Sequence, residues 1–219
     1  MLSVENLTVA FGSNEVLKGI SFHLNSGEIL VIVGESGSGK SISSLSIMGL
    51  LPINTVVKSG SVLFTKDKSI SVDLVKISDE EHRQLRGKDI AMIFQEPHTS
   101  LNPSMRCGKQ LLEAVELNSG LKGKSAEDRC MALLTEMQLP DPKKIYRSYP
   151  HQLSGGQKQR VMIAIALAGN PKLLIADEPT TALDVTVQKS ILALLNDIRN
   201  RYQMGDRKST RLNSSHRIR

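Results

Sequence analysis

The stretch from Gly34 to Ser41 constrains the fold of this chain more than any other part of it. It has the pattern G-x-x-x-x-G-K-[ST], follows the apolar run Ile29 to Val33, and precedes a Ser-rich, helix-compatible run from Ile42 to Leu50. A phosphate-binding loop needs this order of strand, Gly-rich loop and helix. The sequence therefore predicts an α/β fold in which a buried strand leads into an anion site.

The residue types in the loop suit a nucleotide phosphate. Glycines let the backbone approach phosphate oxygens, and the loop amides and the helix N-terminus offer donors and partial positive charge. Lys40 would add a full charge near the β- and γ-phosphates, and the hydroxyl of Ser41 would ligate Mg²⁺. The alternative is a Gly-rich turn before an ordinary helix, which the preceding strand, Lys40 and Ser41 together disfavour. Nucleotide binding is therefore assigned to Gly34, Ser36, Gly37, Ser38, Gly39, Lys40 and Ser41.

The size and composition of the chain limit the classes of protein to which it can belong. The 219 residues suit one large domain or two lobes that share a core, and 40% of them are hydrophobic. No apolar run approaches the ~18 residues of a membrane span, and the first residues lack the regions of a signal peptide. Cys107 and Cys130 form no metal or redox pattern, so we expect reduced packing residues in a cytosolic protein.

The net charge of +6 is a weak indication of a nucleic-acid partner. Residues 206–219 contain five Lys or Arg and one Asp, so four of the six net charges lie in this tail. Aromatic residues make up only 3% of the chain, which argues against a base-stacking surface. No nucleic-acid partner is expected.

Local patterns predict the elements around the loop. Alternating segments predict an antiparallel flap from strands at Ser3–Phe11, Leu17–Leu24, Ser61–Thr65 and Ile70–Ile77. Ser78 is expected to cap a helix over residues 79–86, with Glu81 as the acid of a capping box. Helical periodicity runs from Met105 to Leu139 with a polar break at residues 118–125, and further helices are expected from Ser154 to Ala168 and from Val185 to Tyr202.

Two apolar segments are expected to be buried strands that deliver polar residues. Ile90–Phe94 leads to Gln95, and Leu173–Ala176 leads to Asp177 and Glu178. Asp177 would hold Mg²⁺ or its water, and Glu178 would orient an attacking water as general base. An ordinary acidic strand end would be the favoured reading of this pair if the phosphate loop were absent.

A second Gly-rich helix start, with the letters LSGGQ, lies at residues 153–157. It predicts a second anion site, and one small domain rarely needs two such sites for one triphosphate. Here the sequence resembles the ABC ATPases, whose signature is LSGGQ. The resemblance implies a dimer in which Ser154, Gly155, Gly156 and Gln157 of one subunit close over the γ-phosphate held by the other. A capped helix without a ligand is the alternative.

Further residues take roles from the resemblance. Gln95 matches the Q-loop, which contacts Mg²⁺ or the lytic water and relays their presence to the helical insertion; Asp184 matches the D-loop, which shapes the opposite site. Phe11 stands where the family places an aromatic ring under adenine, and His151 before the signature also fits. Each residue also has a plain structural alternative: Gln95 would be a polar strand end, Asp184 an N-cap, Phe11 a core aromatic and His151 a loop histidine. Lys40, Gln95 and Glu178 are the expected catalytic residues, and Ser41, Gln95 and Asp177 the expected metal ligands.

The resemblance implies a P-loop NTPase of the ABC ATPase type, with a mixed central sheet, an antiparallel β flap and an inserted helical subdomain. We expect the core and β subdomain at residues 1–96, the helical subdomain at 97–152, the second part of the core at 153–205, and a disordered or artefactual tail at 206–219. Ser215-His216 is not expected to be the family's switch histidine, because no apolar strand precedes it. The tail resembles peptide translated from sequencing-adapter DNA; a native basic tail that binds anionic lipid is the alternative. Loss of the family's next strand predicts a gap in the sheet and an unstable chain.

The sequences of residues 94–103 and 179–188 resemble those of the ATP-binding subunits of oligopeptide, dipeptide and nickel importers. This implies an ATPase that uses ATP and Mg²⁺, pairs with a second ABC ATPase subunit and docks on transmembrane permease subunits at the inner face of the cell membrane. A substrate-binding protein would act indirectly. Two alternatives stay open: a truncated module that binds nucleotide without efficient turnover, and a non-transport ABC ATPase that acts on nucleic acid.

Overall fold

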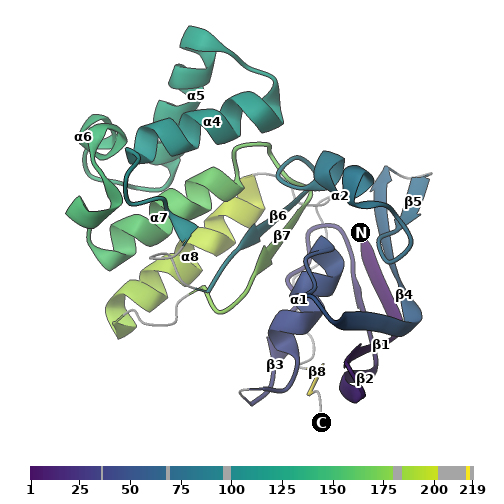
Figure 1. Cartoon of the computed structure of the whole chain (residues 1–219). Helices are drawn as coiled ribbons and strands as arrows, with labels where there is room; N and C mark the ends of the chain where they lie inside the picture. Colours follow the sequence, from purple (N-terminus) through teal and green to yellow (C-terminus); the bar gives the residue numbers. More distant parts are fainter. Residues whose placement is uncertain (36, 68–69, 96–99, 180–183, 202–215, 218–219) are drawn as a thin grey trace. The chain divides into compact units, whose positions relative to one another are not determined.

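The computed structural model describes the chain except for residues 36, 68–69, 96–99, 180–183, 202–215 and 218–219 (Figure 1). It forms two compact units. The first comprises Met1–Leu85 and Gln203–Arg219, and the second comprises Arg86–Tyr202. Among the described residues, no helix is both long and apolar enough to cross a membrane.

The first unit is built on a four-stranded antiparallel sheet with the order β2-β1-β4-β5. Its strands are β1 (Leu2–Phe11), β2 (Asn14–Leu24), β4 (Thr55–Asp67) and β5 (Ile70–Asp73). Leu7, Val9 and Val62 are completely buried on one face, as the two-residue period of a strand requires. The predicted antiparallel flap is confirmed, and β4 begins six residues before the segment expected from its apolar pattern.

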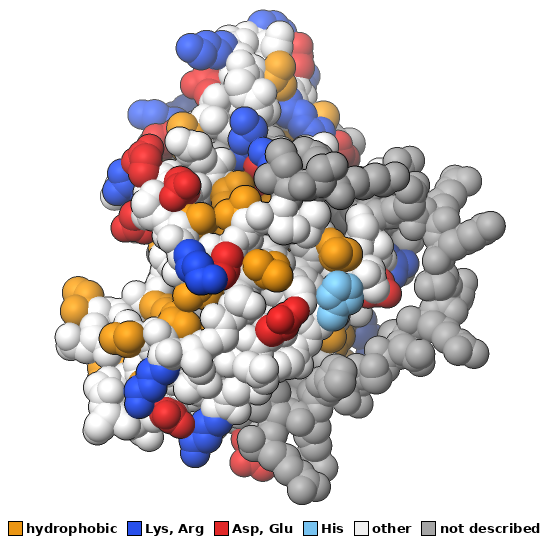
Figure 2. Space-filling view, turned by 90° about the vertical axis from the view of Figure 1, so that its right-hand side faces the viewer, with side chains coloured by type: hydrophobic (Ala, Val, Ile, Leu, Met, Phe, Trp, Pro, Cys, Tyr) orange, Lys and Arg blue, Asp and Glu red, His pale blue; other side chains and the backbone are white. Residues whose placement is uncertain are grey.

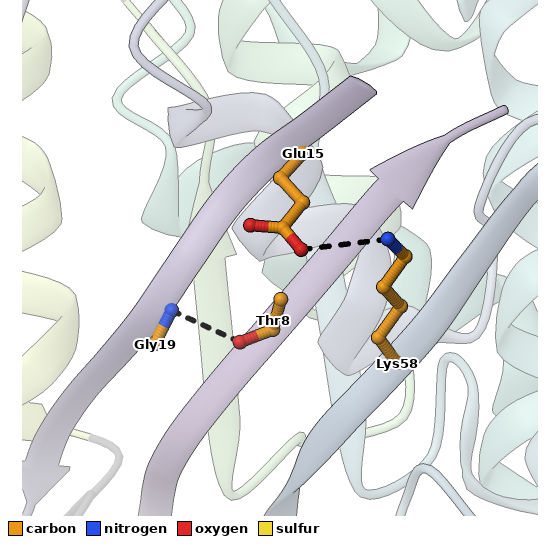
Figure 3. Close-up of polar contacts among 4 residues, drawn as sticks. All are labelled: Thr8, Glu15, Gly19 and Lys58. Carbon is orange, nitrogen blue, oxygen red and sulfur yellow. Dashed lines mark hydrogen bonds and ion pairs between the residues drawn. The ribbon is translucent and has the colours of Figure 1, made fainter. Parts of the chain in front are cut away.

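The other face of this sheet carries polar pairs that cross from strand to strand (Figure 3). Lys58 on β4 lies 3.4 Å from a carboxylate oxygen of Glu15 on β2, and the amide of Gly19 donates to Thr8 Oγ1 at 3.1 Å. Both members of the ion pair are more than 40% exposed, so it adds little stability. These contacts mark the solvent side of the sheet.

The described part of this unit also contains two helices, α1 (Lys40–Met48) and α2 (Asp79–Leu85). The predicted capping box at α2 is confirmed: Ser78 N donates to Glu81 Oε2 at 2.8 Å, and Glu81 N donates to Ser78 Oγ at 3.3 Å. The buried ring of His82 donates from Nε2 to the carbonyl of Leu74 at 2.9 Å and lies against Gly49, the left-handed C-cap of α1.

The strand before the phosphate loop differs from its prediction. Only Ile32–Val33 forms a strand, β3, and Ile29, Val31 and Val33 are 55%, 57% and 42% exposed. Among the described residues, β3 pairs only with β8 (His216–Arg217), a parallel strand two residues long. An apolar strand is buried where neighbours on both edges and layers on both faces enclose it, and so short a partner encloses little. The prediction of a buried strand at residues 29–33 was wrong, whereas the prediction that the tail forms no buried strand stays untested.

The second unit contains the parallel pair β6 (Ile90–Ile93) and β7 (Leu173–Ala176), in which Ile90 lies opposite Leu173. β6 is buried throughout, as predicted, whereas β7 is buried only at Leu173 and exposed at Ala176. β7 has one partner among the described strands, and its unpaired edge explains why the predicted burial is incomplete.

The other described elements of the second unit are helices, which lie to one side of this pair (Figure 1). They are α4 (Cys107–Ser119), α5 (Gly123–Glu136), α6 (Pro142–Arg147), a 3-10 turn at Pro150–Gln152, α7 (Gly155–Ala166) and α8 (Val185–Arg201). Their shared core includes Leu111, Leu133 and Ile163, which are completely buried. The sequence analysis did not predict α6, although Asp141 caps it and Pro142 stands at its first position, two ordinary helix-start signals.

Candidate nucleotide-binding site

The phosphate loop has the backbone that its glycines were expected to provide. Gly37 and Gly39 have φ angles of +82° and +91°, a region that side chains rarely adopt. A Cβ on Gly39 would lie 2.4 Å from a methyl carbon of Leu17, and a Cβ on Gly34 would lie 2.5 Å from Ser38 Oγ. Gly39 is therefore packed tightly against β2 and Gly34 against the loop itself, whereas the space beside Gly37 is open.

Lys40 closes this loop from the first turn of α1. Its ammonium donates to the carbonyls of Gly34 and Glu35, both at 2.9 Å. Gly39, the N-cap of α1, has no side chain that would satisfy the first helical amides, and Ser38 Oγ is buried without a partner. A helix start with uncapped amides beside a lysine is a site for an anion such as phosphate.

The second unit brings Gln95 and Glu178 together. The parallel register of β6 and β7 places the C-terminal ends of both strands at one edge, and Gln95 Nε2 donates to Glu178 Oε2 at 2.9 Å. The backbone amide of Asp177 donates to the carbonyl of Ile93 at 3.0 Å and continues the ladder. Glu178 has a φ of +45°, which is unusual outside glycine and is typical of a constrained site.

Asp177 is 9% exposed and directly precedes Glu178 in the sequence. Carboxylate, amide and hydroxyl oxygens are the ligands that Mg²⁺ prefers, so Asp177, Gln95 and Ser41 fit this ion in donor chemistry. Mg²⁺ usually takes one or two carboxylates together with waters and substrate phosphates. The part of the chain that the structure describes contains no cluster of three or more His, Cys, Asp or Glu.

The signature stretch forms a reciprocal cap on α7. Gln157 N donates to Ser154 Oγ at 3.3 Å, and Ser154 N donates to Gln157 Oε1 at 3.0 Å. Gly155 and Gly156 occupy the first turn, where Gly156 lies close to Val187 of α8: an added Cβ would be 2.9 Å from Val187 Cγ1. The predicted capped helix is confirmed, and the contact with nucleotide stays a prediction.

The remaining predicted residues have plain structural environments. Asp184 Oδ1 accepts from Val187 N at 2.9 Å and caps α8. Phe11 is 52% exposed at the end of β1, so it is not a core aromatic. His151 is exposed and stacks on Tyr149, with ring centroids 5.6 Å apart. Ser36 lies outside the described residues, as do residues 180–183 before Asp184.

Sequence reasoning missed an aromatic and basic group just before the signature. Arg106 at the start of α4 lies 5.8 Å from the centre of the Tyr149 ring, on which His151 stacks. The signal in the sequence was a Tyr and a His spaced two residues apart. Elsewhere, on the face in Figure 2, Lys and Arg side chains are interspersed with Asp and Glu.

Comparison with known proteins places these features in a family. The model of the ABC transporter family matches residues 17–181. The oligopeptide transport ATP-binding protein OppD of Bacillus subtilis is 47% identical over 206 residues, which is 92% of this chain and 56% of OppD. The dipeptide transport ATP-binding protein DppD of Escherichia coli is 47% identical over 208 residues, 93% of this chain and 62% of DppD. The chain thus spans less than two thirds of these relatives.

Solved structures show the same fold. The dimeric ATP-binding cassette MJ0796, in a post-hydrolysis state bound to ADP and Pi, superposes with a TM-score of 0.76 and 29% identity, covering 92% of this chain and 84% of that one. The cbiO1 protein of Clostridium perfringens gives a TM-score of 0.74 and covers 93% and 75% of the two chains. The predicted ABC ATPase fold and the resemblance to peptide-transport subunits are confirmed, and the chain belongs to the ABC transporter family.

Proposed function

We propose that this chain is the ATP-binding and ATP-hydrolysing part of an importer for peptides or nickel. The observation that carries hydrolysis is the 2.9 Å contact between Gln95 and Glu178. A carboxylate held at the end of one strand by an amide from the neighbouring strand has a fixed direction, which a general base requires. The relatives named for oligopeptide and dipeptide transport support the choice of cargo.

The mechanism divides the work between residues. Lys40 and the amides at the start of α1 would bind the β- and γ-phosphates of ATP. Ser41, Asp177 and Gln95 would hold Mg²⁺, which supplies neutralisation of phosphate charge when bound. Glu178 would take a proton from the water that attacks the γ-phosphorus, and ADP would leave. Gln95 keeps the Glu178 carboxylate aimed and connects it to the chain that leads into α4.

Phe11 would stack on the adenine, since its exposed ring at the end of β1 has a free face to offer. Ser154, Gly155, Gly156, Gln157 and Asp184 would meet the nucleotide of a second ABC ATPase subunit, identical or related. Solved relatives described as dimeric support such a pairing. Permease subunits would recruit the dimer to the inner face of the cell membrane, where a substrate-binding protein acts through them.

Steady-state ATP hydrolysis by Glu178→Gln tests this function. Loss of a general base lowers the rate by roughly 10²–10⁴-fold, while binding of ATP should persist because the phosphate loop is intact. Glu113→Gln, which makes the same change on an exposed position of α4, is the matched control and should retain the parent rate.

Three results would sort the candidate functions. A parent chain that binds ATP without turnover would favour the nucleotide-binding module that does not hydrolyse. Stimulation of hydrolysis by DNA or RNA would favour the non-transport ATPase. Unchanged hydrolysis in Glu178→Gln would remove Glu178 from the role of general base.

A further inference from the structure

Arg160 joins three helices of the second unit. From the middle of α7 its Nη1 donates to the carbonyl of Met137, the C-cap of α5, and its Nη2 donates to Ser190 Oγ on α8 at 2.6 Å. The side chain is half-buried, and burial lowers the pKa of its guanidinium from the ordinary value. A planar guanidinium holds two acceptors in fixed directions, which a lysine ammonium does not do.

A second contact lies one turn earlier on the same pair of helices. Gly156 approaches Val187 so closely that an added Cβ would lie 2.9 Å from a methyl group, and only glycine gives this spacing without a shift. Val187 in turn donates its amide to Asp184 Oδ1 at 2.9 Å. The N-cap of α8 is therefore tied to the residue that touches the signature.

The two contacts fix the placement of α7 on α8, which lie side by side in Figure 1. Gly156 and Arg160 are four residues apart on α7, and Val187 and Ser190 are three apart on α8, so each pair lies on one face of its helix. The contacts are separated by about 6 Å along the axis of α7 and about 4.5 Å along that of α8. Two points at this spacing prevent both sliding and rolling of one helix on the other.

We propose that Arg160 is a positioning residue that keeps the signature, Ser154–Gln157, and Asp184 in one fixed arrangement, so that both reach the nucleotide of a second copy of this chain together. The inference rests on the proposed function. Ser154 and Asp184 are the N-caps of the two helices that Arg160 and Gly156 hold, so a change in the α7–α8 contact would move one cap relative to the other. Arg160 would act through these caps and would not itself touch ATP.

ATP-dependent dimer formation provides the test. In a Glu178→Gln chain, which should retain ATP, sedimentation would measure the ATP concentration at half-maximal dimer, and a fluorescent ATP analogue would measure the affinity of the monomer. Ser190→Ala removes one hydrogen bond and should raise that ATP concentration about fivefold, and Arg160→Gln about tenfold or more. Monomer affinity should stay within about twofold, because the phosphate loop is untouched. If Arg160 only stabilised the fold, the variants would have a lower melting temperature, but the ATP concentration at half-maximal dimer would not rise apart from the monomer affinity.

Matched controls remove the same groups where they make only local bonds. Arg199→Gln loses a contact with its neighbour Asn200, and Ser148→Ala loses a bond within α6. Both should dimerise as the parent does. Ser190→Ala preserves the bond from Arg160 to Met137, so it stays informative if Arg160→Gln fails to fold. If the parent dimerises and Ser190→Ala matches it, the role of Arg160 is overturned alone. A parent that binds ATP and stays monomeric overturns this role and the proposed dimer together.

Discussion

The two Gly-rich helix starts in this chain look alike as sequence and differ as structures. The N-cap of α1 is Gly39, which has no side chain, and the Lys40 ammonium donates to two carbonyls of the preceding loop. The N-cap of α7 is Ser154, which exchanges hydrogen bonds with Gln157 in a capping box. The start of α1 has no side-chain cap, so its backbone amides can donate to a ligand, whereas at the start of α7 the amide of Gln157 already donates to Ser154. The comparison supports the proposal that the start of α1 binds ATP within one chain and that the start of α7 completes the site of a second chain.

The glycines of the two starts also do different work. Gly37 and Gly39 have positive φ angles, so their role is conformational. Gly155 and Gly156 are helical, and Gly156 instead allows α7 to lie against Val187. A glycine motif therefore does not reveal from its letters whether it shapes a loop or spaces two helices.

Gly39→Ala is the change expected to cost most stability. The new methyl group would occupy a left-handed backbone and approach Leu17 and the carbonyl of Val16. We expect a loss of about 2 kcal/mol in the free energy of unfolding, measured by urea titration. A loss below about 0.5 kcal/mol would show that the loop relaxes freely and would weaken its assignment as a preformed phosphate site.

Gly156→Ala should cost less, about 1 kcal/mol or below, because alanine improves helix propensity while its methyl group meets a side chain that can move. The same titration measures it. Adding Val187→Ala should recover the loss, since the added methyl group would then have space. A double variant that is no more stable than Gly156→Ala would disprove the spacing role.

Local signals predicted much of this structure. Ser78 with Glu81 predicted a capping box, and Ser154 predicted a helix N-cap; the structure contains both and adds Gln157 as the reciprocal partner of Ser154. Such caps are predictable because they depend on residues three positions apart. The strand ends at Gln95 and Asp177 followed from apolar runs bounded by polar residues. The mutual contact of Gln95 and Glu178 depends on the β6–β7 register, which joins residues more than 80 positions apart.

Other features depended on partners that periodicity cannot supply. The run from Ile29 to Val33 has the composition of a buried strand, yet its exposure is set by what flanks it. The pairing of β8 with β3 involves two residues of a polar tail, for which no local pattern exists. The bond from Lys40 to the Gly34 carbonyl required the loop conformation first. Arg160 ends the signature stretch Leu153–Arg160, but the contacts that it makes depend on the packing of α5, α7 and α8.

Ser154→Ala tests the capping role of Ser154 apart from its proposed contact with nucleotide. Loss of one N-cap should cost about 1 kcal/mol in thermal or urea unfolding. Ser78→Ala removes the equivalent residue of the α2 capping box and should cost a similar amount in the first unit. Ser154→Ala could prove neutral while Ser78→Ala does not. In that case the hydroxyl of Ser154 does not cap α7 in solution, and the capping box of Ser154 and Gln157 is wrong.

Two buried thiols, Cys107 on α4 and Cys130 on α5, report on the packing of the second unit. Burial raises the pKa of Cys107 and of Cys130 to about 11. A raised thiol pKa stabilises the folded chain below the unfolded value near 9.0, and this contribution is lost as pH rises toward 11. At pH 8 both thiols should react with an aromatic disulfide about 100-fold more slowly than in urea. Equal rates in the two conditions would show that α4 and α5 are not packed.

Calorimetric titration of Mg²⁺ and ATP into dilute Glu178→Gln chain, alone and with Lys40→Ala or Ser154→Ala, tests most directly whether the two helix starts differ as proposed. We predict one nucleotide per chain, an affinity about 100-fold weaker with Lys40→Ala because a charged hydrogen-bond partner is lost, and an unchanged affinity with Ser154→Ala. Equal weakening by both substitutions, or weakening by Ser154→Ala alone, would contradict the account.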